Sequence, residues 1–144
     1  MPAVPKGCFD QFTRVGDIAY LSGHLPQPFD DPLIVGKVGK DLTGDEGYEA
    51  AKACGLNLCS TLKENLGSLD RVKKIIKVNG YVNAISTFTE HPKVLNGCSE
   101  LFHKIFDDSV CSHSRCAVGV NGLPLGVPVE VEMIVQLHGD EEGQ

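Results

Sequence analysis

The chain has 144 residues, of which 42% are hydrophobic and 22% charged, a composition typical of a globular protein that can bury one core. We therefore expect a single domain over residues 1–144. The formal net charge of -6 disfavours nucleic acid as a partner, because an acidic surface repels phosphate groups.

The sequence also predicts a compartment. No segment approaches the apolar length that spans a membrane, and the amino-terminal stretch MPAVPKGCFDQF lacks the apolar segment of a signal peptide. None of the six cysteines has C-x-x-C spacing, and Cys54, Cys59 and Cys98 fall within apolar helical patterns, where a free thiol behaves as a small hydrophobic group. We expect a cytoplasmic protein with reduced thiols and no membrane contact.

The amino-terminal part of the chain predicts strands. Residues 9–15 and 18–22 are rich in strand-forming side chains and flank the turn Gly16-Asp17, so we expect a β-hairpin. A proline-rich loop follows. Residues 33–42 predict a further short strand, whose glycines indicate an edge or a bulge.

Two helices are expected. The first begins after Thr43, which forms a T-x-x-E capping box with Glu46, and it ends at Gly67. Its apolar residues recur at spacings of three and four and form one stripe. The second helix covers residues 92–106, with Pro92 in its first turn.

Three more strands complete the predicted order, at residues 70–84, 114–120 and 127–138. The fold class is therefore α+β, with a mixed six-stranded sheet backed by two helices. In the last strand the valines alternate with Glu130 and Glu132, and we expect Arg115 to share the face of these glutamates. Such a face is too polar for a monomer core, which favours an oligomer that encloses it.

Arg115 and Glu130 are the candidates for chemistry. An arginine can bind a carboxylate through two parallel hydrogen bonds, but it can equally form a surface ion pair. Glu130 can act as a general base or position a water, although a solvated strand residue is the commoner case. Glu132 can be the partner of a structural salt bridge. These alternatives stay open from the residues alone.

No metal or cofactor is expected. The five histidines have no H-x-H or H-x-x-x-H spacing, and the chain has no phosphate-binding glycine motif and no G-x-S-x-G. His113, two residues before Arg115, either lines a site or is a solvated loop residue. We expect Cys116 to point away from Arg115 and to be a packing thiol.

Four stretches resemble the Rid/YjgF family, whose members are also known as L-PSP endoribonucleases or translation inhibitors. They are GCFDQFTRVGDIAYLSGHLP, LDRVKKIIKVNGYVN, FTEHPKVLNGCSELFHKIF and SRCAVGVNGLPLGVPVEVEMIV, and together they span about residues 7–138. The stretch VGKDLTGDEGYEAAKACGLNLCSTLK is more like a divergent branch of the family.

The resemblance implies a chorismate-mutase-like fold, assembled as a homotrimer whose sheets enclose a central barrel and whose ligand clefts lie between subunits. It implies a cofactor-free hydrolytic deaminase that converts reactive enamine and imine (2-imino acid) intermediates to 2-keto acids and ammonia. Positioning alone can supply much of this catalysis, because a protonated imine is already electrophilic.

The resemblance also implies roles for individual residues. Arg115 would clamp the substrate carboxylate, Glu130 would orient the attacking water, and Asn96 would line the cleft together with Ser22 and Gly23. The chain departs from the family at three places. Phe9 stands where the family has a tyrosine near the ligand, Ala117 stands where it has a cysteine, and the loop before Arg115 is longer.

Two other functions remain as alternatives. One is a trimeric protein that binds small carboxylates without turning them over. The other is an endoribonuclease or translation inhibitor, against which the acidic charge and the lack of paired histidines weigh.

Overall fold

The structure is a computed structural model that describes residues 7–139. Residues 1–6 and 140–144 lie outside the described part, so the first half of the amino-terminal stretch MPAVPKGCFDQF, in which no signal peptide is expected, is not described. In chain order the elements are β1 (Phe12–Val15), β2 (Ile18–His24), α1 (Gly44–Leu66), the 3-10 helix η1 (Leu69–Arg71), β3 (Val72–Asn83), α2 (His91–Ile105), α3 (Asp108–Cys111), β4 (Ser114–Val120), the 3-10 helix η2 (Pro124–Gly126) and β5 (Val129–Leu137).

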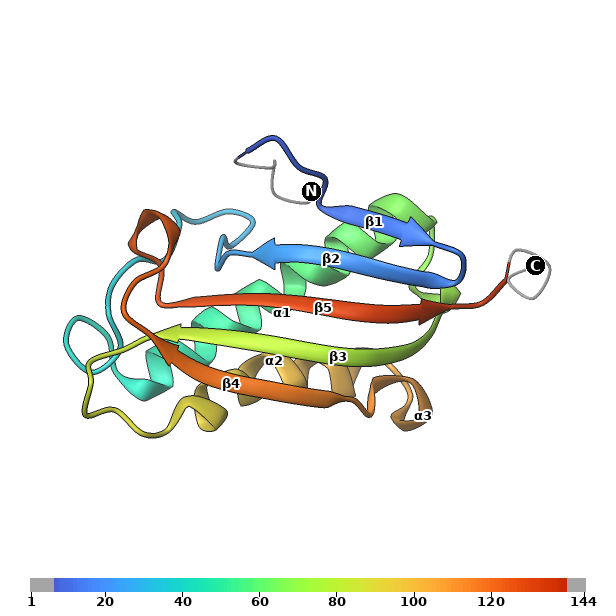
Figure 1. Ribbon diagram of the computed structural model, residues 1–144. Helices are drawn as coiled ribbons and strands as arrows, with labels where there is room; N and C mark the ends of the chain where they lie inside the picture. The colour runs from blue at the N-terminus through green and yellow to red at the C-terminus, as the bar shows by residue number, and fades with distance from the viewer. Residues whose placement is uncertain (1–6, 140–144) are drawn as a thin grey trace.

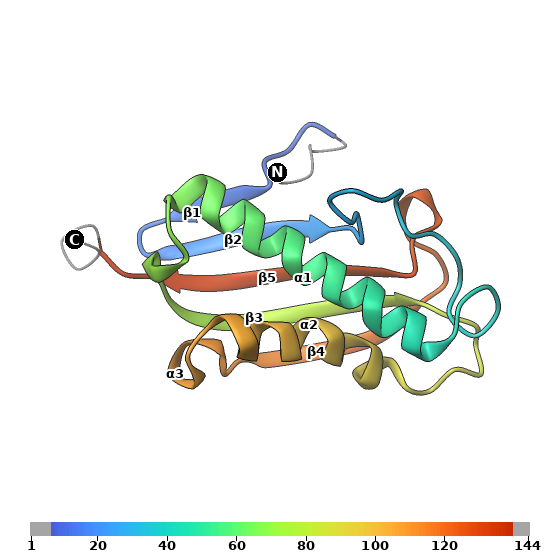
Figure 2. The ribbon, with the colours of Figure 1, turned by 180° about the vertical axis from the view of Figure 1, so that it is seen from behind.

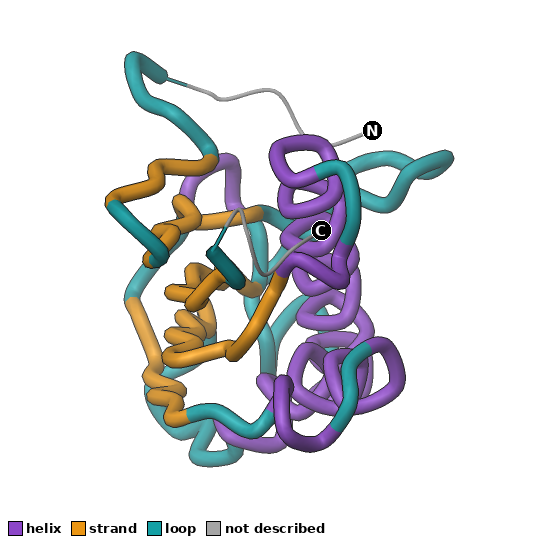
Figure 3. The backbone as a smooth tube through the Cα atoms, turned by 90° about the vertical axis from the view of Figure 1, so that its right-hand side faces the viewer, coloured by secondary structure: helices purple, strands orange, loops and turns teal. Residues whose placement is uncertain are grey.

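The strands form one mixed sheet in the order β1-β2-β5-β3-β4, in which β3 and β4 are parallel and all other neighbours are antiparallel. Figure 1 shows the sheet from its uncovered face, and Figure 2 shows α1 and α2 lying across the other face. Seen along its edge, the molecule has two layers, sheet and helices (Figure 3). The α+β class is confirmed, and we call the two sides of the sheet the helix face and the open face.

The sheet has five strands among the described residues, so the predicted sixth strand at residues 33–42 is wrong. Gly36 and Gly39 adopt positive φ values of 129° and 93°, which an extended strand does not use. The carbonyl of Lys37 accepts hydrogen bonds from the amides of Lys40, Asp41 and Leu42, and this curls the segment into a turn. Only isolated bridges at Val38 remain of a strand.

Both helices follow their sequence signals closely. In α1 the Thr43 hydroxyl accepts from the amide of Glu46, and the Glu46 side chain accepts from the amide of Thr43, as the capping box predicts. Gly67 ends the helix with φ 82°, and its amide donates to the carbonyl of Lys63. No helix of the described residues is both long enough and apolar enough to cross a bilayer.

The core lies between the helices and the helix face. Along β5 every second residue from Val129 to Leu137 is fully or almost fully buried, which matches the predicted alternation. Cys54, Cys59 and Cys98 are free thiols in this core, as expected. Burial raises the pKa of the Cys59 thiol to about 12, so this thiol is protonated at neutral pH.

Candidate functional site

Arg115 lies on the helix face, so the expectation that it shares a face with Glu130 is wrong. In the parallel pairing of β4 with β3, Arg115 stands opposite Val78, which is completely buried beneath the helices. Paired residues point to the same side of a sheet. Because β4 is an edge strand, the arginine is not buried in the core but reaches along α2.

The Arg115 guanidinium is held by two groups of α2. Its Nη1 donates to the Ser99 hydroxyl at 3.2 Å, and its Nη2 donates to the carbonyl of Pro92 at 3.4 Å. Asn96 is four residues after Pro92 and three before Ser99, a spacing that places all three on one side of a helix. Asn96 therefore lies on the side of α2 that holds Arg115. We call Arg115, Asn96 and Ser99 the arginine half.

Glu130 lies on the open face, against the end of β2. A β-carbon on Gly23 would lie 2.6 Å from Glu130 Oε2, closer than any real contact, so the carboxylate occupies space that only a glycine leaves free. The pairing of β2 with β5 is irregular between Leu21 and His24, which allows this close approach.

The amino-terminal segment is attached to the same end of β2. The Ser22 hydroxyl donates to the carbonyl of Asp10 at 2.6 Å, and the Ser22 amide donates to the carbonyl of Gln11 at 3.0 Å. The neighbouring Phe9 side chain is 47% exposed and lies before β1, which starts at Phe12 rather than at the predicted residue 9. We call Phe9, Ser22, Gly23 and Glu130 the glutamate half.

The two glutamates of β5 have different surroundings. Glu132 accepts hydrogen bonds from the Tyr81 hydroxyl at 2.5 Å and from the Asn79 amide at 3.4 Å, and the first bond raises the pKa of Tyr81 to about 12. Burial raises the pKa of Glu130, and the negative charge of Glu132 adds to this rise. Glu132 is thus the hydrogen-bonded structural carboxylate, whereas Glu130 is a half-buried carboxylate whose raised pKa suits a base.

The two halves are far apart within one chain. Glu130 on β5 pairs with Tyr81 of β3, and Arg115 on β4 pairs with Val78, which is three residues away along β3. Strands β5 and β4 lie at opposite edges of β3. The spacing of neighbouring strands and the rise per residue then put their α-carbons about 14 Å apart. Since the two side chains also point to opposite faces, one chain cannot place both against the same small ligand.

Ser99, Tyr81 and the role of His113 were missed by the sequence analysis. His113 is half-buried and hydrogen-bonded to Ser99 and to the carbonyl of Cys111, so it is not a solvated loop residue. The position of Ser99, one helical turn after Asn96, was the available signal. Cys116 does point away from Arg115, but it is exposed on the open face opposite Asn79 and is not a packing thiol.

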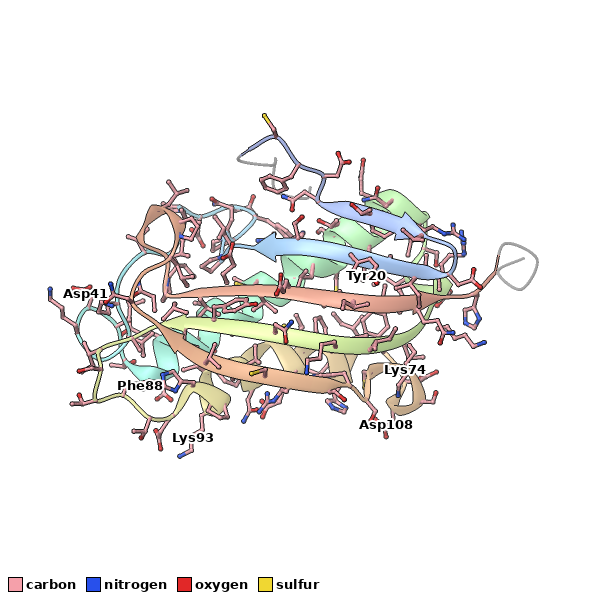
Figure 4. The ribbon with its side chains drawn as sticks, viewed as in Figure 1. Tyr20, Asp41, Lys74, Phe88, Lys93 and Asp108 are labelled. Atoms are coloured by element: carbon pink, nitrogen blue, oxygen red, sulfur yellow. The ribbon has the colours of Figure 1, made fainter. Side chains whose placement is uncertain are left out.

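One group of possible ion-binding side chains occurs among the described residues, where one potential ligand atom each of His103, Asp108 and Cys111 lies within 4.8 Å of the other two. A hydrogen bond of 3.1 Å between His103 Nδ1 and Cys111 Sγ and a contact of 3.6 Å between His103 Nδ1 and Asp108 Oδ1 account for this grouping. The ammonium of Lys74 donates to the Ser109 carbonyl beside it, which works against a metal cation. Figure 4 labels Lys74 and Asp108 at this end of the sheet.

Comparison with known proteins gives a consistent family signal. Residues 2–137 match the model of a family described as "YjgF/chorismate_mutase-like, putative endoribonuclease". Protein TCP17 of Trypanosoma cruzi is 40% identical over 94% of this chain and 85% of its own.

Two solved structures extend the comparison. A "putative endoribonuclease" from Shewanella oneidensis is 32% identical and has a TM-score of 0.90, over 95% of this chain and 90% of its own. RidA from the Antarctic bacterium Psychrobacter sp. PAMC 21119 is 26% identical and has a TM-score of 0.60, over 94% and 93% of the two chains.

Proposed function

The chain belongs to the YjgF/chorismate-mutase-like (Rid) family, and from this premise we propose that it is a cofactor-free hydrolytic deaminase of 2-imino acids. The substrates are reactive enamine and imine intermediates that carry a carboxylate, and the products are 2-keto acids and ammonia. The observation that carries the proposal is the Arg115 guanidinium, fixed at the edge of the sheet by Ser99 and by the Pro92 carbonyl.

Arg115 supplies the carboxylate clamp. The two hydrogen bonds to α2 use only part of the N–H donors of the guanidinium, so further donors are available for a bidentate bond to a carboxylate. The planar guanidinium group matches the geometry of a carboxylate. Asn96, on the same side of α2, lines the place where the rest of the substrate lies.

Glu130 supplies the base. It accepts a proton from a water molecule as the water attacks the imine carbon, and a pKa raised by burial makes it a better proton acceptor. Glu130 returns this proton to the amino nitrogen of the addition product and the carbon–nitrogen bond breaks. Ammonia leaves, Glu130 takes up the proton of the hydroxyl group, and the carbon keeps the oxygen as a keto group. Each water molecule consumed releases one ammonia.

Because the two halves cannot meet within one chain, we place the site between chains of a homotrimer. The arginine half of one chain would face the glutamate half of its neighbour. Both outer strands support this assembly, since β1 and β4 each have a neighbour on one side only within the described sheet. The polar open face would then line a central barrel.

The first test measures ammonia release from an enzymatically generated 2-imino acid. We expect the wild-type protein to accelerate release over buffer and Arg115→Ala to abolish the acceleration. Calorimetry with 2-ketobutyrate runs in parallel. Binding that depends on Arg115 without any acceleration would mean a carboxylate-binding protein and would overturn the enzymatic proposal.

The second test asks whether the site is shared. We expect Arg115→Ala and Glu130→Gln each to be inactive. Refolding the two together should restore about one quarter of the wild-type activity, because in a cyclic assembly that fraction of sites pairs an intact arginine with an intact glutamate. Each variant refolded alone is the control. No recovery in mixed assemblies of normal size would mean that the site does not combine these two halves.

A second candidate function is endoribonuclease activity, which is favoured by the description of similar structures such as the Shewanella oneidensis protein. The net charge of -6 opposes it. We expect RNA cleavage to disappear on stringent purification. Cleavage that persists and is lost in Arg115→Ala would favour this alternative.

A further inference from the structure

A chain of hydrogen bonds runs from the Arg115 guanidinium to the end of α3. Arg115 Nη1 lies 3.2 Å from Ser99 Oγ, Ser99 Oγ lies 3.0 Å from His113 Nε2, and His113 Nδ1 lies 2.5 Å from the carbonyl oxygen of Cys111. The chain joins β4, α2 and the short α3, and none of its links lies within one helix or one strand pair.

The direction of each bond follows from the two ends of this chain. The Cys111 carbonyl can only accept, so His113 carries its proton on Nδ1, and Nε2 of the neutral ring is an acceptor. The Ser99 hydroxyl therefore donates to Nε2. The guanidinium can only donate, and it meets a free lone pair of the Ser99 oxygen.

We propose that Ser99 and His113 are positioning residues for Arg115, and that the neutral ring of His113 holds the Ser99 hydroxyl in the orientation that accepts from the guanidinium. This inference rests on the proposed function, in which Arg115 clamps a carboxylate. It adds two residues that never touch the substrate but fix the direction of the clamp.

Packing restricts the members of the chain. Ser99 is 9% exposed and Phe102, one turn later on α2, is completely buried. The His113 ring stands edge-on to Phe102, with 6.2 Å between centroids and 81° between planes. Cys111 is completely buried, which fixes its carbonyl. The arrangement is therefore built before a ligand arrives.

Protonation of His113 would reverse one bond. Both ring nitrogens would then be donors, and the Ser99 oxygen would have to accept from two cations. The charged and titratable groups that face the ring are Arg115 on β4, His103 on α2 and Lys74 on β3, and all of them oppose a positive charge there. Burial is the main cause that lowers the pKa of His113, so the ring is neutral at physiological pH.

The test measures the affinity for 2-ketobutyrate by calorimetry between about pH 5 and about pH 8. We expect Ser99→Ala and His113→Phe each to weaken binding about tenfold at neutral pH, the value of one hydrogen bond to a charged group. The double variant should be no weaker than Ser99→Ala alone, because both changes break one chain. Ser99→Thr keeps the hydroxyl and should restore binding, and Ser112→Ala, an exposed neighbour, is the matched control.

Two readouts separate positioning from a general structural effect. Wild-type affinity should fall as the pH drops through the pKa of His113, whereas His113→Gln, which cannot titrate, should lack this step. Nitrogen-15 NMR of the imidazole should show the Nδ1–H tautomer in the free protein. Additive effects of the two substitutions, an Nε2–H tautomer, or normal binding by Ser99→Ala would each overturn the inference.

The Arg115→Ala arm distinguishes this outcome from failure of the proposed function. If Arg115→Ala binds as the wild type does, the carboxylate clamp itself is wrong, and the positioning inference falls with it. If Arg115→Ala loses binding while Ser99→Ala keeps it, only the positioning inference is wrong.

Discussion

Two histidines at the two ends of the candidate site make the same pair of hydrogen bonds. His24 bonds through Nδ1 to the carbonyl of Ser22 and through Nε2 to the hydroxyl of Thr61 on α1. His113 bonds through Nδ1 to the carbonyl two residues earlier, that of Cys111, and through Nε2 to the hydroxyl of Ser99 on α2. The hydrogen bonds of His24 thus connect the end of β2 to α1, and those of His113 connect the start of β4 to α2.

The difference lies in what the hydroxyl does next. Thr61 is 1% exposed, and His24 itself is 1% exposed, so that pair belongs to the core. The Ser99 hydroxyl also accepts from Arg115, and His113 is only half-buried. The same local arrangement therefore stabilises the fold at one end, whereas at the other end it also holds the guanidinium of Arg115. In the glutamate half, the absence of a side chain at Gly23 leaves the space that the Glu130 carboxylate occupies.

Beyond the loss of Arg115 or Glu130 itself, the largest expected effect comes from Gly23→Ala. The new β-carbon would lie 2.6 Å from Oε2 and 2.7 Å from Cδ of Glu130, so the carboxylate must move. We expect kcat to fall about a hundredfold, as for a base displaced by about 1 Å, with a smaller change in affinity for keto acid. Gly122→Ala, which meets no atom within 4 Å, is the control. An affinity loss with unchanged kcat would contradict the assignment of Glu130.

Arg115→Lys should give the opposite signature. Lysine keeps the charge but lacks the planar fork, so we expect about tenfold weaker binding of substrate and keto acid with kcat largely retained. Steady-state kinetics separate KM from kcat. Arg14→Lys, on the opposite edge strand β1, is the matched control. Equal losses from both substitutions would mean that Arg115 is not the clamp.

The two histidines should differ in their effect on stability. Burial lowers the pKa of His24 below its usual 6.5, so the unfolded chain binds a proton that the folded one excludes. The contribution of His24 to the free energy of unfolding is therefore fully present above about pH 6.5. It decreases as the pH drops below this value, by at most about 1.4 kcal/mol per pH unit.

Urea denaturation at several pH values, at one fixed protein concentration, measures this slope. His24→Gln should flatten it more than His113→Gln does, because His24 is the more deeply buried ring. A larger flattening in His113→Gln would reverse the ranking of the two histidines.

The smallest expected effect concerns Glu132. Its negative charge contributes to the raised pKa of Glu130, so Glu132→Gln should lower that pKa. The acidic limb of the pH–rate profile should then move to lower pH by less than about one unit, since burial is the larger cause. A shift to higher pH would exclude this electrostatic coupling.

Local patterns predicted the elements that local forces determine. The capping box at Thr43, the end of α1 at Gly67 and the alternation along β5 need only neighbouring residues, and all three were predicted. The turn at residues 33–42 depends on two positive-φ glycines, which a pattern of apolar residues does not reveal.

The side of the sheet on which Arg115 lies could not be predicted, for a different reason. Alternation shows that Arg115 and Ala117 share a side of β4, but both sides of this edge strand carry partly exposed residues, so the pattern does not indicate which side faces the helices. That depends on the register between β4 and β3, a tertiary property. The link from Ser99 to His113 likewise depends on how α2 packs against the end of α3.

The opposite orientation of Arg115 and Glu130 has a consequence for how activity scales with the amount of protein. If every site is completed by a second chain, dilution below the dissociation constant of the assembly removes sites without unfolding any chain. Specific activity would then rise with concentration until assembly is complete. The total activity in a cell would then increase more than proportionally with the amount of this chain that the cell makes.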